Sequence, residues 1–151
     1  MSGALRDRWL ARAEHRLTQA GLRAGAARTA VVELLAREGH CLMSAQEVCD
    51  RLRATGTASP ASVYRVLDQL CDLGLLHRLY GKDGVARYEI VDPENHHHHL
   101  VDEGSGEVRP FKDEQLEEAI EKVGRRLGVR ITGHEVTLRG SLERPPKRSQ
   151  G

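Results

Sequence analysis

The sequence is poor in aromatic residues and cysteines and has no long apolar run. Aromatic residues make up only 3% of the chain, so we do not expect it to bind single-stranded nucleic acid by stacking bases on aromatic rings. The three cysteines, Cys41, Cys49 and Cys71, form no CxxC pair. Their odd number argues against a disulfide framework and predicts a reducing, cytoplasmic environment. We also expect neither a membrane span nor a signal peptide.

The chain has almost no net charge, but positive charge gathers at its beginning. The net charge is +1 over 151 residues, whereas residues 1–28 carry six arginines against two acidic residues. Such a basic segment can face the phosphates of a nucleic acid. A solvated helix face would have the same composition, so charge alone does not separate the two interpretations.

The first half of the chain is predicted to be helical. Apolar residues recur at helical spacing in 4–20 and again in 26–37. Ser44-Ala-Gln-Glu47 has the pattern of a capping box and predicts the start of a third helix. Ser59-Pro60 predicts the start of a fourth, with serine as N-cap and proline at the first helical position. The first helix is expected to bury Leu5, Trp9, Ala13 and Leu17.

The fourth helix has the features of a DNA recognition helix. Its polar face carries Ala61, Ser62, Tyr64 and Arg65, which gives a slim N-terminal end followed by hydrogen-bond donors. A helix of this kind can enter the major groove, although an ordinary surface helix also has a polar face. Strands predicted at 75–80 and 85–91 flank a glycine-rich turn that carries Lys82. Helices followed by such a hairpin predict a winged helix–turn–helix.

The sequence changes character after Pro93. Strands are predicted at 98–101 and 107–110, an acidic amphipathic helix at 113–127 and a last strand at 129–139. The helix is expected to turn Leu116, Ala119, Ile120, Val123 and Leu127 inward. A unit this small has little core of its own, so we expect it to pair with a second copy. The predicted fold class is therefore α+β, with a winged helix–turn–helix followed by a small α/β dimerisation domain.

Four consecutive histidines stand in the segment Asn95–Asp102, "NHHHHLVD". Because successive side chains of a strand point to opposite faces, His97 and His99 share one face and His96 and His98 share the other. A run of four can thus supply a pair of ligands to each of two metal sites. An exposed polar loop is the alternative; a purification tag would normally be terminal and longer.

Each pair of histidines needs further ligands to complete a metal site. His77 and Glu89 lie on the predicted hairpin strands, His134 lies within the predicted last strand, and Glu117 lies on the acidic helix. Taken singly, each of them is more often an ordinary surface residue than a ligand. Imidazole nitrogen with carboxylate oxygen suits zinc, and also iron, nickel and copper.

In combination, five stretches resemble the ferric uptake regulator superfamily, and in particular its zinc uptake regulator branch. The resemblance runs from about Leu17 to Gly140. The stretches are Ala20-Gly-Leu-Arg23 with Arg28, Ser44-Ala-Gln-Glu47, Ala61-Ser-Val-Tyr-Arg-Val-Leu67, His96–Leu100 and Gly128-Val-Arg-Ile-Thr-Gly-His-Glu-Val136.

The resemblance implies a homodimer, two metal sites and a set of DNA contacts. It places a regulatory hinge site at His77, Glu89, His97 and His99. It places a second site at His96, His98, Glu117 and His134. It assigns Tyr64 and Arg65 to the recognition helix and Arg23 to the minor groove. The expected domains are a winged helix at 1–91, a hinge at 92–95, a dimerisation and metal-binding domain at 96–140 and a disordered tail at 141–151.

The chain departs from the family at the cysteines that hold a structural zinc in most relatives. Asp102 and Ser105 stand where the first CxxC pair would be, and the C-terminal tail has no cysteine. We therefore expect no structural zinc bound by four cysteines. The turn Gly104-Ser-Gly106 can close its hairpin without a metal.

These features predict a cytoplasmic, metal-responsive repressor that binds a palindromic DNA operator as a homodimer and controls metal uptake genes. The nitrogen-rich sites favour zinc. A sensor of iron, manganese or nickel, or of peroxide, is the first alternative. A small metalloenzyme or a metal buffer belongs to a different class. We expect no enzyme, because the sequence has neither HExxH nor a nucleophile constellation.

Overall fold

The computed structural model describes residues 3–22, 25–39, 41–56 and 58–142. The chain forms two compact units: an N-terminal one, Met1–Tyr80 with Gly84–Asn95, and a C-terminal one from His96 onward, with which Gly81–Asp83 are grouped. Each unit is described by itself. Arg23, expected at the minor groove, lies outside the described residues, as does the expected tail from residue 143 onward.

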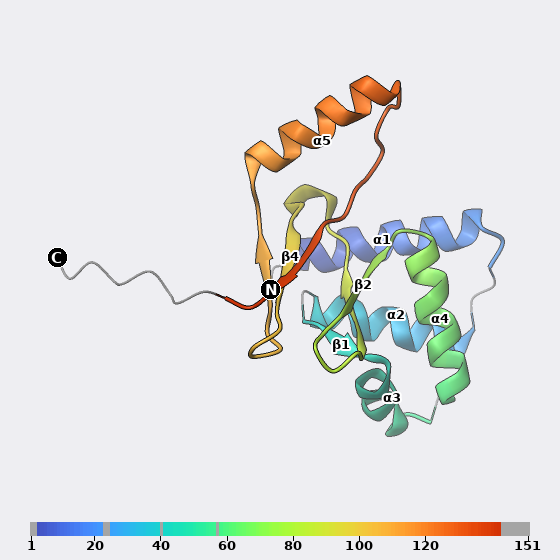
Figure 1. The fold of residues 1–151 in the computed structure, drawn as a ribbon. Helices are drawn as coiled ribbons and strands as arrows, with labels where there is room; N and C mark the ends of the chain where they lie inside the picture. Colours follow the sequence, from blue (N-terminus) through green and yellow to red (C-terminus); the bar gives the residue numbers. More distant parts are fainter. Residues whose placement is uncertain (1–2, 23–24, 40, 57, 143–151) are drawn as a thin grey trace. The chain divides into compact units, whose positions relative to one another are not determined.

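In its described residues, the N-terminal unit combines four α-helices with a small antiparallel sheet (Figure 1). Strand β1 pairs with β3 and β3 pairs with β2, so the sheet order is β1-β3-β2. The predicted helices and hairpin are all present, with ends that differ by a few residues at most. The elements are α1 Gly3–Gln19, α2 Ala26–Glu38, β1 Met43–Ser44, α3 Ala45–Arg53, α4 Pro60–Asp72, β2 Leu76–Tyr80, β3 Ala86–Ile90 and the short 3-10 helix η1 Pro93–Asn95.

The apolar stripes of the helices meet in one hydrophobic core. The expected face of α1 is buried, and Trp9 at its centre is completely inaccessible to solvent. Its indole Nε1 donates a hydrogen bond of 3.0 Å to the carbonyl of Leu75, so the polar edge of this large side chain is satisfied. The stripe of α4 is buried as predicted, through Val63, Val66, Leu67 and Leu70.

Both predicted helix starts are confirmed. The Ser44 hydroxyl accepts a hydrogen bond from Glu47 N at 3.1 Å, and the Glu47 carboxylate accepts one from Ser44 N at 2.8 Å. This reciprocal pair satisfies two backbone donors at the beginning of α3. Ser59 caps α4 through its hydroxyl, which accepts from Ser62 N at 3.2 Å.

Three of the four arginines of α1 are engaged within the N-terminal unit. Arg12 donates to the carbonyl of Val91, and Arg16 donates to that of Leu73 at 2.9 Å. Arg8 forms an ion pair of 3.1 Å with Glu94. The basic charge of α1 therefore ties this helix to the loop before β2 and to the segment that leaves β3, a role that the count of charges did not predict.

The C-terminal unit contains three strands and one long helix. They are β4 His98–Asp102, β5 Val108–Phe111, α5 Glu114–Leu127 and β6 Thr137–Gly140. The sheet order is β5-β4-β6, with β5 antiparallel and β6 parallel to β4. None of the helices in the described ranges is long and apolar enough to cross a membrane.

The prediction of a strand at 129–139 is wrong for most of these residues. Only Thr137–Gly140 forms a strand, and residues 129–136 have no regular structure. His134 therefore lies in a connection and not in the middle of a strand. The alternation of apolar and polar residues is real, but here Ile131 packs against Gly124 of α5 and not against a neighbouring sheet.

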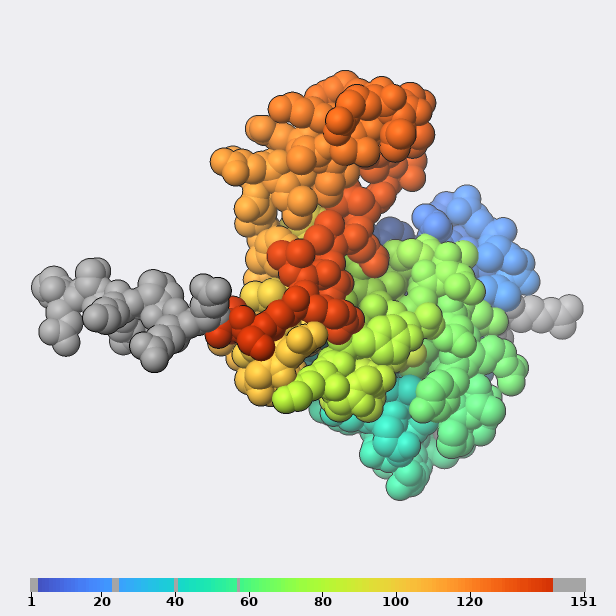
Figure 2. Space-filling model, in the orientation of Figure 1, coloured from blue at the N-terminus to red at the C-terminus, as the bar shows by residue number. Residues whose placement is uncertain are grey.

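The apolar stripe of α5 is largely uncovered in the single chain. Leu116 and Ile120 are half-buried, whereas Val123 is 42% and Leu127 is 70% exposed. Figure 2 shows α5, in orange, at the surface of the C-terminal unit. Together with Val129, Ile131 and their neighbours, the stripe lines an apolar groove of about 270 Å³. The sequence predicted that this apolar stripe faces inward, but in a single copy of the chain it largely faces solvent.

Candidate metal centres

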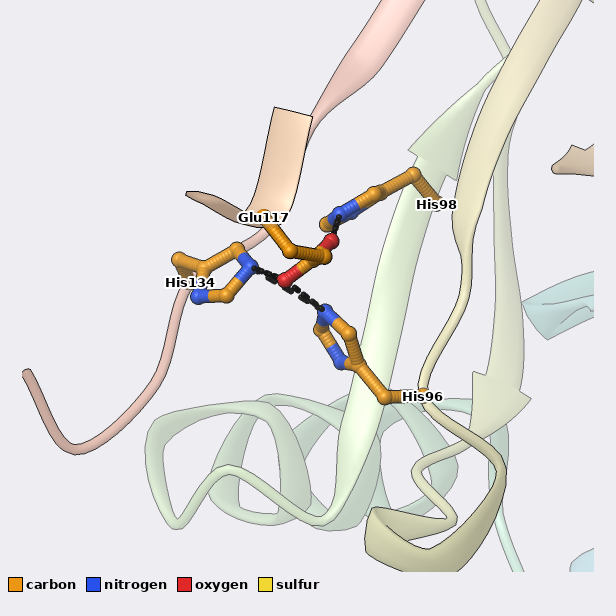
Figure 3. Close-up of side chains that lie close together, drawn as sticks. All are labelled: His96, His98, Glu117 and His134. Atoms are coloured by element: carbon orange, nitrogen blue, oxygen red, sulfur yellow. Dashed lines mark hydrogen bonds and ion pairs between the residues drawn. The ribbon is translucent and has the colours of Figure 1, made fainter. Parts of the chain in front are cut away.

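The side chains of His96, His98, Glu117 and His134 converge in the C-terminal unit (Figure 3). One potential ligand atom from each lies within 4.8 Å of all the others. His98 Nε2 is 2.5 Å from Glu117 Oε1, and His134 Nε2 is 2.7 Å from Glu117 Oε2. His96 Nε2 is 3.1 Å from His134 Nε2 and 3.6 Å from Glu117 Oε2. The structure thus brings together the four residues assigned to the second site.

Three different elements position these four side chains. His96 and His98 are two residues apart where the chain enters β4, so their rings lie on the same side with centroids 4.7 Å apart. Glu117 extends from the first turn of α5, whose N-cap Asp113 accepts from Leu116 N at 2.9 Å. His134 comes from the irregular segment after α5. His98 is also held by its other ring nitrogen, which accepts from Val136 N at 3.3 Å.

The donor set fits a divalent metal ion. Three imidazole nitrogens and one carboxylate make up a set that zinc takes in proteins, and iron and nickel also accept imidazole. Ligands about 2.0 Å from a tetrahedral zinc are about 3.3 Å from each other. The four interatomic distances above, from 2.5 to 3.6 Å, bracket that value.

The charge state of Glu117 suits a ligand. Burial raises the pKa of its carboxyl group, but hydrogen bonds from His98 and His134 lower it, and the net pKa lies below the ordinary value. The group is therefore an ionised carboxylate near neutral pH. An ionised carboxylate is the form that coordinates a cation.

The four residues expected at the hinge site are divided between the two units. In the N-terminal unit, His77 on β2 is directly opposite Glu89 on β3, so both side chains stand on the same face of the hairpin. In the C-terminal unit, the rings of His97 and His99 have centroids 4.9 Å apart. Each half is therefore a pair of potential ligands on one face, as the alternation predicted for His97 and His99.

The residues expected to contact DNA lie on α4 and on the turn of the hairpin. Tyr64 is 51% exposed although it is a large aromatic residue, and Ala61 and Arg65 next to it are also exposed. Ser62 is half-buried because it takes part in the cap of the helix. Lys82 is exposed in the turn between β2 and β3. The polar face of α4 is thus accessible, as a recognition helix requires.

A hydrogen-bonded carboxylate closes the hairpin at the position of the missing cysteines. Asp102 accepts from the hydroxyl of Ser105 at 2.6 Å and from the backbone N–H groups of Gly104 and Leu142 at 3.0 and 3.4 Å. The bond from Ser105 contributes most to lowering the pKa of Asp102. Asp102 therefore ties the β4–β5 turn to the residues that follow β6. Sequence reasoning noted the replacement of the cysteines but missed this contact to Leu142.

Comparisons with known proteins agree on one family. The model of the ferric uptake regulator family matches residues 19–139. The ferric uptake regulation protein of Shigella flexneri is 32% identical over 125 residues, which cover 82% of this chain and 84% of that protein.

Solved structures extend this similarity to the fold. The ferric uptake regulator of Pseudomonas aeruginosa with manganese aligns with a TM-score of 0.74 at 29% identity and covers 87% of this chain and 98% of that one. A zinc-bound manganese uptake regulator aligns with a TM-score of 0.55 at 30% identity, over 86% and 98% of the two chains. These structures confirm the α+β fold class expected from the sequence.

Proposed function

The chain belongs to the ferric uptake regulator family of metal-responsive transcriptional regulators and is not an enzyme; we propose that it represses metal uptake genes when zinc is plentiful. The observation that carries this proposal is the convergence of three imidazoles and one ionised carboxylate at His96, His98, Glu117 and His134. The regulator acts in the cytoplasm, where its DNA lies.

Regulation depends on the hinge site, formed by His77, Glu89, His97 and His99. Two pairs of potential ligands, one on each unit, support this assignment. Coordination would join ligands of both units and so favour one orientation of the winged helix relative to the dimerisation domain. Without it, the linker at 92–95 leaves many orientations accessible. The shift in population follows because only one arrangement provides all the ligands.

Zinc is the metal that the donor atoms favour. Three nitrogens and one carboxylate at the second site, and three histidines with Glu89 at the hinge site, are nitrogen-rich sets, whereas manganese prefers sites rich in oxygen. Relatives with manganese and with zinc are both known. A sensor of iron, manganese or nickel, or of peroxide, is therefore the alternative within the family.

The regulator works as a homodimer that pairs through the C-terminal unit. The exposed stripe on α5 supports this, since it leaves Val123 and Leu127 in water in the single chain. A second copy is the occupant that the family implies. A dimer presents two recognition helices, which matches a palindromic operator with half-sites one helical turn apart.

DNA is contacted by α4 and by basic residues around it. Ala61 and Ser62 allow close approach to the major groove, and Tyr64 and Arg65 supply donors for bases and phosphates. Lys82 on the hairpin and Arg23 before α2 complete the proposed contacts with phosphate and the minor groove. The exposed positions of Ala61, Tyr64 and Arg65 support this assignment.

Fluorescence anisotropy with the gene's own upstream DNA tests the proposal. Chelator-stripped protein is titrated with zinc, manganese and iron(II) in separate experiments. We expect tight, salt-sensitive binding that appears only with zinc. His97→Ala removes one hinge ligand and should abolish the response, whereas His15→Ala removes an exposed histidine of α1 and should not.

Each other outcome overturns a different part of the proposal. Activation by manganese or iron(II) in place of zinc would contradict zinc as the metal that is sensed, but it would agree with the proposed mechanism. Binding that is indifferent to every metal contradicts regulation through the hinge site. Metal binding without DNA binding under any condition would favour a metal buffer.

A further inference from the structure

The segment that carries His134 packs on α5 at a glycine. Gly124 is buried, and a Cβ atom placed on it would lie 2.7 Å from Ile131 Cδ1 and 2.9 Å from Ile131 Cγ1. It would also lie 3.3 Å from the carbonyl oxygen of Val129. A side chain at this position would therefore require the Ile131 side chain to shift and would press on the backbone of the returning segment at Val129.

The end of α5 directs the chain back toward the sheet. Gly128 has a positive φ of 66°, which a residue with a side chain rarely adopts. The N–H of Gly128 donates to Arg125 O at 3.2 Å, and the N–H of Val129 donates to Gly124 O at 2.9 Å. These two bonds form the Schellman motif, which ends a helix and reverses the chain. Figure 1 shows the segment returning from the end of α5 toward β6.

The spacing of Glu117 and Gly124 along α5 matches the spacing of Ile131 and His134 along the returning segment. Glu117 and Gly124 are seven residues apart, so they share one face of the helix and are about 10 Å apart along its axis. His134 is three positions after Ile131, and three steps of extended chain also span about 10 Å. Seating Ile131 on Gly124 thus leaves His134 level with Glu117, where the two side chains meet at 2.7 Å.

Helix stability does not account for a glycine at this position. Glycine is less favourable than alanine in a helix, because it loses more backbone freedom on folding. Gly124 lies in the last turn of α5, three residues before the end of the helix at Leu127. The close approach of Ile131 explains why a residue without a side chain stands at this position of α5.

We propose that Gly124 is a positioning residue of the second site, because it lets Ile131 seat on α5 and thereby sets His134 opposite Glu117. This inference rests on the proposed function in that it takes the second site to bind metal. Gly124 touches none of the ligand atoms and acts only through the register of the returning segment.

Cobalt(II) titration of the full chain tests the proposal, with His97→Ala present in every protein so that the hinge site does not contribute. We expect Gly124→Ala to weaken cobalt binding by about tenfold or more, the scale found when residues that orient metal ligands are changed. The double variant Gly124→Ala/Ile131→Ala makes room for the new methyl group and should recover most of the affinity. Visible absorption of the bound cobalt reports whether His134 still coordinates.

Gly133→Ala is the matched control. It adds the same methyl group next to His134, where a Cβ would meet nothing within 4 Å. We expect its cobalt affinity to stay within about twofold of the parent, as for an ordinary surface substitution. Far-ultraviolet circular dichroism checks that Gly124→Ala keeps its helix, which alanine should favour.

A measurement without metal separates this inference from the proposed function. In the metal-free protein, nuclear Overhauser contacts should join the Ile131 δ1 methyl to the α protons of Gly124. If these contacts are present but the parent binds no cobalt, the metal site fails and the positioning role fails with it. If the parent binds cobalt and Gly124→Ala binds equally well, only the positioning role is overturned.

Two further outcomes also overturn the positioning role. Equal losses in Gly124→Ala and Gly133→Ala would point to stiffness of the backbone and not to register. Because Gly124 also lines the apolar groove, the oligomeric state is measured by light scattering. A change in oligomeric state with unchanged cobalt affinity would assign Gly124 to an interface.

Discussion

The N-terminal unit buries Trp9, Leu34 and Leu67 completely, whereas the largest fully buried side chain of the C-terminal unit is His98. All members of the hydrophobic core found in the described residues lie between Leu5 and Ile90. In the C-terminal unit, buried positions are occupied mainly by polar groups such as His99 and Asp102, with Val101 as the apolar exception. The two units therefore obtain their stability from different sources.

This difference indicates how the regulator divides its work. A hydrophobic core holds α4 in place whether or not metal is present, so the DNA-reading surface is preformed. A unit whose largest fully buried side chain is the potential ligand His98 and whose apolar stripe is exposed gains stability from metal and from a second copy. The response to metal is thus located where the hydrophobic effect contributes least.

The largest expected effect comes from removing the centre of the N-terminal core. Trp9→Ala leaves a cavity and removes one of the two hydrogen bonds that the Leu75 carbonyl accepts, while the bond from Val91 N remains; it should lower the free energy of unfolding by about 3–5 kcal/mol. Trp9→Phe keeps most of the ring and should cost less. Urea denaturation measures the loss. Cobalt binding at the second site should be unchanged under conditions where the protein is folded; its loss would contradict the independence of the two units.

Removal of metal should have the next largest effect and should act on the C-terminal unit. A ligand present at 100 times its Kd stabilises the folded form by about 2.7 kcal/mol, so zinc should raise the melting temperature measurably. Calorimetry of chelator-treated and zinc-loaded protein measures the shift. In a His97→Ala background, in which the hinge site does not contribute, His98→Ala should remove the shift, whereas His15→Ala should retain it. An equal shift in both variants would show that zinc acts elsewhere.

A smaller effect is expected from the capping box of α3. Ser44→Ala removes the hydroxyl that accepts from Glu47 N and should cost about 1 kcal/mol of stability. Urea denaturation should detect it in the N-terminal unit in the presence and absence of zinc alike. A loss that appears only without zinc would break the proposed separation.

The smallest effect concerns Asp102 and depends on pH. Its folded pKa is lower than its unfolded value of about 3.9, so its hydrogen bonds stabilise the fold above that pH. This contribution is lost as the pH falls through the folded pKa. Asp102→Asn should lower the melting temperature at neutral pH and flatten its dependence on pH in the acid range. A parallel pH profile in the variant would show that Asp102 is not responsible.

Structure could be predicted from the sequence where the residues that a pattern packs against or caps lie in the same unit. The stripe of α1 predicted the burial of Trp9 and Leu17, and the Ser44 and Ser59 signals predicted where α3 and α4 begin. These predictions depend on local rules of spacing and capping, and the apolar residues concerned are buried in the core of the same unit. The histidine alternation likewise predicted the pairs that the structure shows.

Structure could not be predicted from the sequence where a residue contacts a part of the protein that its local pattern does not specify. The alternation over 129–139 looks the same whether Ile131 faces a sheet or a helix, so the strand was predicted too long and His134 was misplaced within it. The stripe of α5 was expected to turn inward, yet nothing in the described part of the chain covers Leu127. The bond from Arg12 to Val91 joins residues far apart in sequence, which a count of charges does not reveal.

Hydrogen–deuterium exchange of the full chain, with and without zinc, tests the central claim most directly. The account predicts that zinc slows exchange in β4, in α5 and in residues 129–136, while α1 to α4 remain equally protected in both states. Equal protection of the C-terminal unit without zinc would contradict it, because that unit would then be stable without its ligand cluster being filled.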